Sequence, residues 1–300
     1  MQTPESERMR SFAGGLGSGD RAAGSPLGIG LFAKMRSAAG GPAWQPVVPK
    51  DADATMMNLM CRGLRESREA FVEPIGKGIH RPHRVEFHGG FDSGPVTTKR
   101  GALKTVFCQF ENKRYCSSVD LDVTGPEREI LSFALDKAFG FDLVPPTIGR
   151  EISGIGNGSV QAWVDCPTAW EWIGKGYDYR KDRTNPWLHR LAAFDFIRGE
   201  IDRHSNNWIM DETRRVYAID NGYSFVKGDD RTWLKSSAGK NLIGTPIHPG
   251  VAAEIAAIDV DVAFSLVNSV RFKNGEADGV VKRIQELKGL TEWRKLGKKW

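Results

Sequence analysis

The sequence predicts an α+β protein with two lobes, a β-rich first lobe with one main helix and a helical second lobe. Between about residues 71 and 110, short apolar segments alternate with glycine and proline, which is typical of strands joined by turns. From residue 186 onward, apolar residues recur mostly at helical spacing. A chain of 300 residues is long enough to bury a large core around a cleft.

The elements of the first lobe can be placed in order along the chain. We expect a helix at about residues 54–70 and strands over residues 71–76, 84–88 and 102–110. Each of these strands is short, and segments rich in glycine and proline separate them as turns.

A longer helix is expected after residue 124. Thr124 can cap it, Pro126 occupies its first turn, and the charges of Glu127 and Glu129 favour its positive end. Gly140 would end it, because glycine readily adopts the left-handed conformation found at helix C-termini. This segment is the main helix of the first lobe.

The second lobe is expected to be mainly helical. A buried strand over residues 158–164 completes the sheet, and helices follow over residues 186–198 and about 251–272. The tail, residues 281–300, has apolar residues at helical spacing and carries much of the basic excess, so it predicts an amphipathic helix with a basic outer face. This tail could dock on the body of the protein or contact an anionic partner, and the sequence leaves both open.

Residues 1–55 differ from the rest of the chain because they are rich in glycine, alanine and serine and lack a sustained period. Such a composition buries too little apolar surface to offset the entropy of ordering, so we expect a flexible arm, which could become ordered against an assembly partner. The predicted organisation is therefore an arm, an N-lobe over 56–160, a C-lobe over 161–280, and the basic tail.

The composition limits the classes of protein that need to be considered. With 40% hydrophobic and 26% charged residues, the chain is neither disordered throughout nor fibrous. No apolar run approaches the roughly 18–20 residues needed to cross a bilayer, and the N-terminus lacks the apolar region of a secretory signal. The four cysteines are scattered without a C-x-x-C pair, which favours a reducing compartment. We expect a soluble, cytoplasmic protein without a membrane span.

The net charge of +5, from 42 basic and 37 acidic residues, is mild. A solvated and slightly cationic surface explains this charge better than nucleic-acid binding does, so no nucleic-acid partner is expected.

The stretch 194–225 carries the chemistry. A loop after an amphipathic helix holds Asp202 and Asn207, and a short hairpin then brings Asp220 to the same edge, followed by Gly222 for a tight turn. Carboxylate and amide oxygens are the hard ligands that Mg²⁺ prefers. Phosphoryl transfer from ATP also needs a carboxylate free of the metal, which orients the acceptor hydroxyl and takes its proton. Asn207 and Asp220 are therefore candidate metal ligands, and Asp202 is the candidate base.

Two motifs in this stretch resemble those of a known family. D-R-H-x-x-N begins at Asp202, and I-D-x-G places its aspartate, Asp220, eighteen residues later. Together they look like the phosphatidylinositol 3-/4-kinase-like branch of the protein-kinase-like fold. The phrase AIDNGYSF is especially similar to type II phosphatidylinositol 4-kinases and to small bacterial and secretory-pathway atypical kinases. The resemblance covers roughly residues 70–225 and implies a two-lobed, kinase-like fold that binds ATP.

The resemblance also implies roles for the motif residues. Asp202 would be the catalytic base, while Arg203 and His204 would complete the catalytic motif by supporting the loop or the γ-phosphate. Asn207 and Asp220 would bind Mg²⁺, with Mn²⁺ as an alternative.

Further nucleotide-binding residues follow from the same resemblance. Lys104 would contact the ATP phosphates and Glu129 would hold it, and the strand carrying Gln161 and Val164 would lead to the hinge that receives adenine. Lys99 or Lys113 could replace Lys104, and Glu127 lies on the same helical turn as Glu129. These alternatives stay open.

The sequence also departs from the family pattern. It lacks the H-R-D, D-F-G and A-P-E motifs, so it is not a conventional protein kinase. The loop over the phosphates is expected at residues 88–94, with residues 75–80 as the alternative. No basic segment suited to gripping an inositol phosphate follows Asp220.

The expected function is therefore ATP- and Mg²⁺-dependent transfer of the γ-phosphate to a hydroxyl group, preferably a serine or threonine of a protein. A phosphoinositide or a small molecule is the alternative acceptor. Adenylate transfer on the same fold is a second hypothesis. A third is a kinase-fold scaffold that the arm and the tail anchor in a larger assembly.

Overall fold

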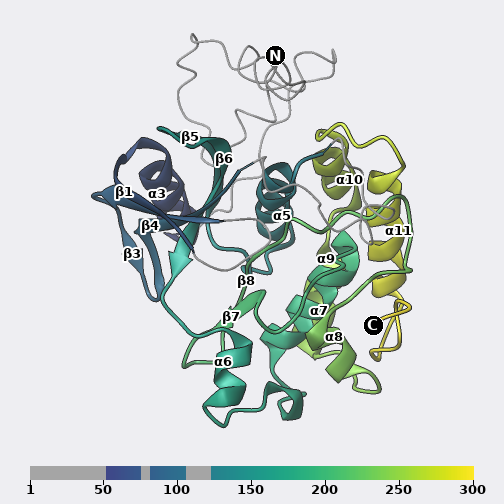
Figure 1. Cartoon of the computed structure of the whole chain (residues 1–300). Coiled ribbons are helices and arrows are strands. Elements are labelled where there is room, and N and C mark those ends of the chain that lie inside the picture. The colour runs from purple at the N-terminus through teal and green to yellow at the C-terminus, as the bar shows by residue number, and fades with distance from the viewer. Residues whose placement is uncertain (1–51, 76–81, 106–122) are drawn as a thin grey trace, which may run out of the picture.

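The computed structural model describes residues 52–75, 82–105 and 123–300, with side chains from residue 56 onward. This part of the chain is a mixed α+β structure, as predicted, in which one antiparallel sheet lies beside a group of helices (Figure 1). The predicted arm falls almost wholly outside the described residues. The helix α3, Ala52–Glu66, already begins within the range that the sequence assigned to the arm.

The sheet has the order β1-β2-β4-β6-β5, with β3 paired to β4 and every pair antiparallel. Its strands are β1 Arg68–Pro74, β2 His83–His88, β3 Asp92–Ser93, β4 Val96–Thr105, β5 Thr147–Ile152 and β6 Gly156–Val164. The strand β6 lies between two neighbours and is buried along most of its length. This strand ends at Val164, four residues beyond the position at which the sequence analysis divided the N-lobe from the C-lobe.

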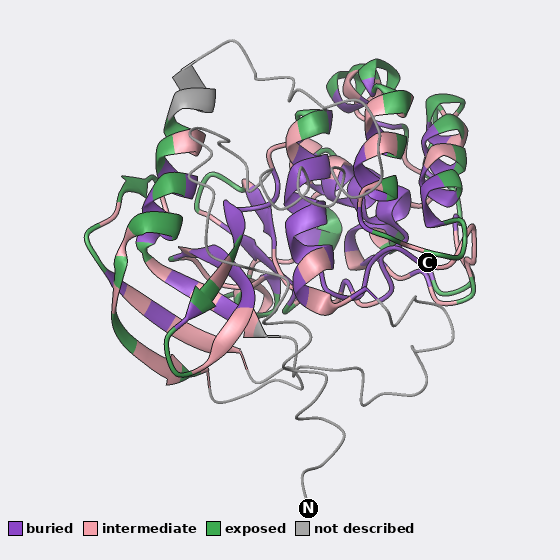
Figure 2. Cartoon of the chain, turned by 90° about the horizontal axis from the view of Figure 1, so that it is seen from above, coloured by how far each residue is buried: buried purple, intermediate pink, exposed green. Residues whose placement is uncertain are grey.

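The helix α5, Gly125–Phe139, lies between the sheet and the other helices (Figure 1). Thr124 caps it in a capping box with Glu127, and Gly140 ends it in the left-handed conformation, both as predicted. Most of its side chains are buried, because it packs on β4, β5 and β6 on one side and on α9 and α10 on the other. Figure 2 shows that the buried residues concentrate where the sheet, α5 and the helical part meet.

The helical part contains the predicted helices and also several short elements that were not predicted from the sequence. Its elements are α6 Ala169–Gly174, a 3₁₀ turn Tyr179–Lys181, α7 Pro186–Arg198, β7 Trp208–Met210, β8 Val216–Ala218, α8 Ser237–Leu242, α9 Pro249–Ala257, α10 Val260–Asn268 and α11 Glu276–Lys288. The single helix expected over 251–272 is two helices. Asp259 caps the second helix by accepting bonds from its first backbone N–H groups, so the chain turns there.

The C-terminal tail docks on the body, which decides one of the alternatives left open by the sequence. Trp293, Leu296 and Trp300 are all buried. The Trp300 ring lies against Gly239 of α8, where an added Cβ would come within 2.0 Å of the ring. Only glycine allows this contact.

Within the described ranges, no helix combines the length and apolar character needed to span a bilayer.

Candidate active site

Lys104 lies at the end of β4 and forms an ion pair with Glu129 of α5. Its Nζ is 2.5 Å from Oε1 of Glu129 and 3.0 Å from Oδ1 of Asp220. Burial alone would lower the pKa of Lys104, but Asp220 and Glu129 outweigh it, so the pKa rises and the ammonium stays charged. These contacts favour Lys104 over Lys99, which pairs with the exposed Asp92. Lys113 lies outside the described residues.

The choice between the two glutamates of α5 is also decided. The carboxylate of Glu127 accepts bonds from the backbone and hydroxyl of Thr124, so it serves the helix cap. Glu129 is 2% exposed and faces the sheet.

The hairpin of β7 and β8 brings Asn207 and Asp220 together. The backbone N–H of Ile219 donates to the carbonyl of Asn207 at 3.2 Å, which extends the Trp208–Ala218 pairing by one residue. Asp220 then adopts φ = 54°, a left-handed conformation that is uncommon for a residue other than glycine and is often found at functional sites. Two residues thirteen positions apart thus lie at one edge.

Arg203 is fully buried and all its contacts are internal. Its Nε donates to Asp195 at 3.0 Å, and Nη1 donates to the carbonyls of Asn207 and Ile219. Its Nη2 donates to Oδ1 of Asn221 at 2.6 Å. Of the two roles expected for Arg203, these four hydrogen bonds and its complete burial favour support of the loop over contact with a γ-phosphate.

Asn221 extends this chain of contacts from Arg203 to Glu129 of α5. It is fully buried, accepts from Arg203 and donates Nδ2 to Oε2 of Glu129 at 3.1 Å. One amide side chain therefore joins the Lys104 ion pair to the loop between α7 and β7, residues 199–207, which we call the catalytic loop after the role expected from the sequence. Asn221 was not predicted as a site residue, because its position in the sequence does not indicate that Glu129 of α5 is its partner.

Beneath the catalytic loop lies a group of four buried charges, Asp195, Arg198, Glu200 and Arg203, which we call the buried charge cluster. Arg198 is 3.2 Å from Asp195, and Oε2 of Glu200 lies 3.5 and 3.6 Å from Arg198 and Arg203. The other oxygen of Glu200 accepts the backbone N–H groups of Ile201 and Asp202. Burial raises the pKa of Glu200 to about 7, against the opposing effect of the two arginines. The cluster fixes the backbone that carries Asp202.

Asp202 points away from the buried charge cluster and is 21% exposed. Lys235 lies 3.4 Å from its Oδ1, and Nε2 of His204 lies 3.8 Å from its Oδ2. Burial raises the pKa of Asp202, Lys235 and His204 oppose this, and Asp220 adds to it, with a net increase. A carboxylate with a raised pKa accepts protons more readily, which suits a general base.

Gln161 and Val164 are buried in β6 and face their neighbours in the sheet. Nε2 of Gln161 donates to Oγ1 of Thr147 at 2.9 Å, which joins β6 to β5. Val164 pairs with Val96 at the far end of β4. The side chain of Gln161 therefore has a structural contact within the sheet, and Val164 is buried at the end of β4 that lies opposite Lys104.

The loop expected over the phosphates, residues 88–94, is in the wrong place. Strand β3 in this loop pairs with Val96 and Thr97, at the opposite end of β4 from Lys104. Eight residues of strand correspond to about 26 Å. The β1–β2 connection is at the correct end, since His83 pairs with Leu103. It contains the alternative, residues 75–80, most of which lies outside the described residues.

The donor set suits Mg²⁺ bound together with phosphates better than a metal held by the protein alone. Among the described residues, no three His, Cys, Asp or Glu side chains gather closely enough to hold a metal ion. Asp220 supplies one carboxylate. Nδ2 of Asn207 donates to the carbonyl of Asp202, which leaves its amide oxygen as the ligand atom. Mg²⁺ is commonly held by one or two protein oxygens plus substrate phosphates and water, and these residues fit that arrangement.

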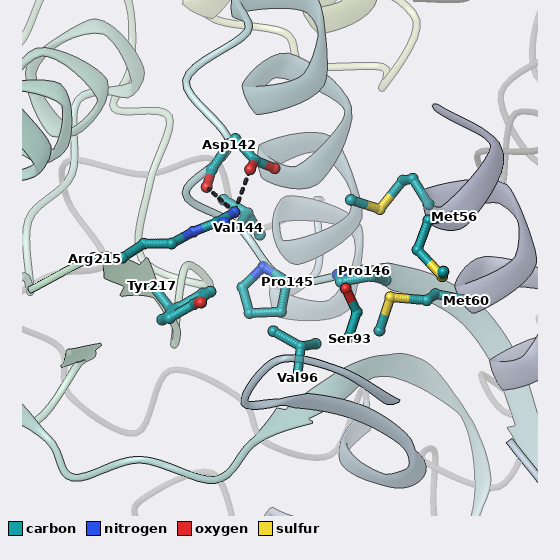
Figure 3. Close-up of a pocket in the computed structure, with 11 residues that line it drawn as sticks. Met56, Met60, Ser93, Val96, Asp142, Val144, Pro145, Pro146, Arg215 and Tyr217 are labelled. Carbon is teal, nitrogen blue, oxygen red and sulfur yellow. Dashed lines mark hydrogen bonds and ion pairs between the residues drawn. The ribbon is translucent and has the colours of Figure 1, made fainter. Parts of the chain in front are cut away.

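A small pocket lies elsewhere, between α3 and the segment that follows α5 (Figure 3). It has a volume of about 140 Å³ and is lined by methionines of α3, by Pro145 and Pro146, and by the Asp142–Arg215 ion pair. None of the site residues described above lines it, so it is separate from the candidate active site.

No protein-family model matches this chain, and neither does any curated protein.

Proposed function

We propose that this protein is an ATP- and Mg²⁺-dependent phosphotransferase, an atypical kinase whose sheet and helical part correspond to the two lobes of a kinase-like fold. The observation that carries the proposal is the chain of contacts from Lys104 through Glu129 and Asn221 to Arg203. It joins a phosphate-binding type of ion pair to a loop bearing a carboxylate of raised pKa, and phosphoryl transfer needs both.

Each residue has a role in this proposal. Lys104, held by Glu129, binds the phosphates of ATP on the nucleotide side. Asp202 orients the acceptor hydroxyl and takes its proton as the acceptor oxygen bonds to the γ-phosphorus. The bond from that phosphorus to the bridging oxygen breaks, and its electron pair leaves with ADP.

Asp220 and Asn207 would hold the magnesium ion. When bound, the ion supplies neutralisation of phosphate charge. Asp220 contacts Lys104 at 3.0 Å, so the same carboxylate also positions the ammonium.

The proposed acceptor is a serine or threonine hydroxyl of a protein. A phosphoinositide is disfavoured because Arg231, in the segment after Asp220, is taken up by Asp229 and Glu286. The described cysteines Cys61 and Cys166 are unpaired, which agrees with a cytoplasmic location.

Two variants test the proposal. Asp220→Ala should abolish Mg²⁺-dependent ATP binding, measured by calorimetry, while Asp202→Ala should keep nucleotide binding and lose turnover. Asp261→Ala, an exposed aspartate on α10, is the matched control and should behave as wild type. Equal ATP turnover by wild type and the Asp220 variant would contradict the proposal.

The group transferred is identified separately by intact-mass analysis of proteins incubated with the enzyme and ATP. A mass increase of one phosphate is expected. An increase of one adenylate would replace phosphotransfer by nucleotidyl transfer on the same site.

A further inference from the structure

Lys235 lies beside the proposed base but belongs to neither sequence motif. Its Nζ is 3.4 Å from Oδ1 of Asp202, and its side chain is 38% exposed. It lies fifteen residues after Asp220, in the segment that leads into α8. Nothing in the amino-acid sequence distinguishes Lys235 from the other lysines of this region.

The backbone around Lys235 is fixed to the catalytic loop. Its N–H donates to the carbonyl of Glu200 at 2.9 Å, and the N–H of Ser237 donates to the carbonyl of Arg203 at 3.0 Å. Between them, the hydroxyl of Ser236 donates to Asp195 of the buried charge cluster at 2.7 Å. The lysine is therefore anchored at its backbone, while its ammonium reaches a partly exposed site over a long and weak contact.

Phosphoryl transfer needs positive charge on the acceptor side of the γ-phosphoryl group. The residues of the two motifs and Lys104 do not supply this charge. Lys104 is committed to Glu129 and Asp220 on the nucleotide side. Arg203 is buried, and its hydrogen bonds are to groups of the protein. His204 accepts the N–H of Asn206 at Nδ1, and its Nε2 faces Oδ2 of Asp202 at 3.8 Å. A preorganised cation in such a site stabilises the charge that develops in the transition state.

We propose that Lys235 is a catalytic residue that contacts the γ-phosphoryl group during its transfer, an inference that rests on the proposed phosphotransferase function. Before the reaction its ammonium pairs with ionised Asp202. As Asp202 takes the acceptor proton, the carboxyl becomes neutral and its attraction for the ammonium falls. At that stage the negative charge is on the phosphoryl oxygens and on the departing ADP. The ammonium of Lys235 therefore moves toward the phosphoryl oxygens and keeps its own proton.

The test compares Lys235→Met with Lys240→Met, which removes an exposed lysine of α8 only five residues away. Binding of Mg²⁺–ADP and of Mg²⁺–ADP with aluminium fluoride, a mimic of the transferring phosphoryl group, is measured by calorimetry. We expect Lys235→Met to bind Mg²⁺–ADP within about threefold of wild type and the aluminium fluoride complex about 100-fold more weakly. Single-turnover ATP hydrolysis should slow by a similar factor, and Lys235→Arg should retain most of both.

Three outcomes would overturn the inference. If Lys235→Met binds the aluminium fluoride complex as tightly as Lys240→Met does, Lys235 does not contact the transferred group. If Mg²⁺–ADP and its aluminium fluoride complex weaken equally, the lysine serves ground-state binding only. If wild type neither turns over ATP nor binds Mg²⁺–ADP, the proposed function itself fails, and this result is distinct from the other two.

Discussion

The buried underside and the partly exposed upper side of the catalytic loop both carry charged residues, but they hold them in different ways. On the underside, Arg203 is fully buried and every nitrogen of its guanidinium group donates to a protein oxygen. On the upper side, Asp202, His204 and Lys235 meet over 3.4–3.8 Å and are partly exposed. Arg203, which fixes the shape of the loop, has a hydrogen bond on every nitrogen of its guanidinium group, whereas the groups available for chemistry have weak partners that a substrate can replace.

The largest effect should come from the underside. Arg203→Met removes one of the two arginines that pair with the buried Asp195, and it leaves the carbonyls of Asn207 and Ile219 without this donor. We therefore expect the free energy of unfolding to fall by about 3–5 kcal/mol. Urea unfolding followed by tryptophan fluorescence measures it. Arg180→Met, which breaks a surface pair with Asp178, is the control and should lower the free energy of unfolding far less, because water screens exposed charges. Equal costs would show that the underside is not the rigid part.

The next effect should come from Asn221, which joins the loop to α5. Asn221→Ala removes one acceptor for Arg203 and one donor to Glu129, so a loss of about 1–3 kcal/mol is expected. The affinity for Mg²⁺–ATP should also fall, because Glu129 no longer has a fixed orientation against Lys104. A double variant with Glu129→Gln checks the coupling, since the two losses should not add if the residues act through one contact.

A smaller effect on stability is expected on the upper side. Asp202→Asn replaces a carboxylate whose pKa is raised by burial, so the free energy of unfolding should change by less than about 1 kcal/mol. Turnover should be lost at the same time. A loss of stability as large as that of the Arg203 variant would remove the distinction between the two sides.

The smallest effect should be a pH dependence of the free energy of unfolding that comes from His189, on the same helix as Asp195. His189 of α7 is neutral, and its Nδ1 accepts from Nε1 of Trp293 and from the N–H of His248. Burial lowers the pKa of His189 below its ordinary value of 6.5, and the nearby His248 lowers it further. The unfolded chain therefore takes up a proton first as the pH falls through 6.5, and the folded state loses stability there. Above this pH the contribution is fully present.

Urea unfolding of wild type and His189→Gln at about pH 7.5 and about pH 5.5 measures this dependence. Wild type should lose more stability on acidification than the variant does. An equal loss in both would assign the dependence to other groups.

The local features of the fold were predictable from the sequence. Thr124, Pro126 and Gly140 mark the ends of α5 because capping and left-handed termination depend on residues within one helical turn. The helix over 186–198 was predicted at its observed bounds for the same reason. The position of the loop over the phosphates was predicted wrongly, because distance along the chain from Lys104 does not show which end of a strand a loop occupies.

The candidate site divides in the same way. Asp202, Asn207 and Asp220 were found because a short hairpin fixes their separation, so their proximity is nearly a local property. Asn221 and Lys235 could not be assigned, because their partners come from α5 and from a segment thirty-three residues away. The sequence also left open whether the tail docks on the body, because Trp300 fits only where α8 presents Gly239.

By itself, the amino-acid order determined the α+β class, the boundaries of the main helices and the short-range spacing of the acidic motif, all of which depend on neighbours within one or two turns of chain. Tertiary structure alone decided which lysine meets Glu129, that Arg203 faces inward, and that a second lysine reaches Asp202. Such pairings depend on the register of strands and the packing of distant helices, where burial makes an unpaired charge too costly to leave.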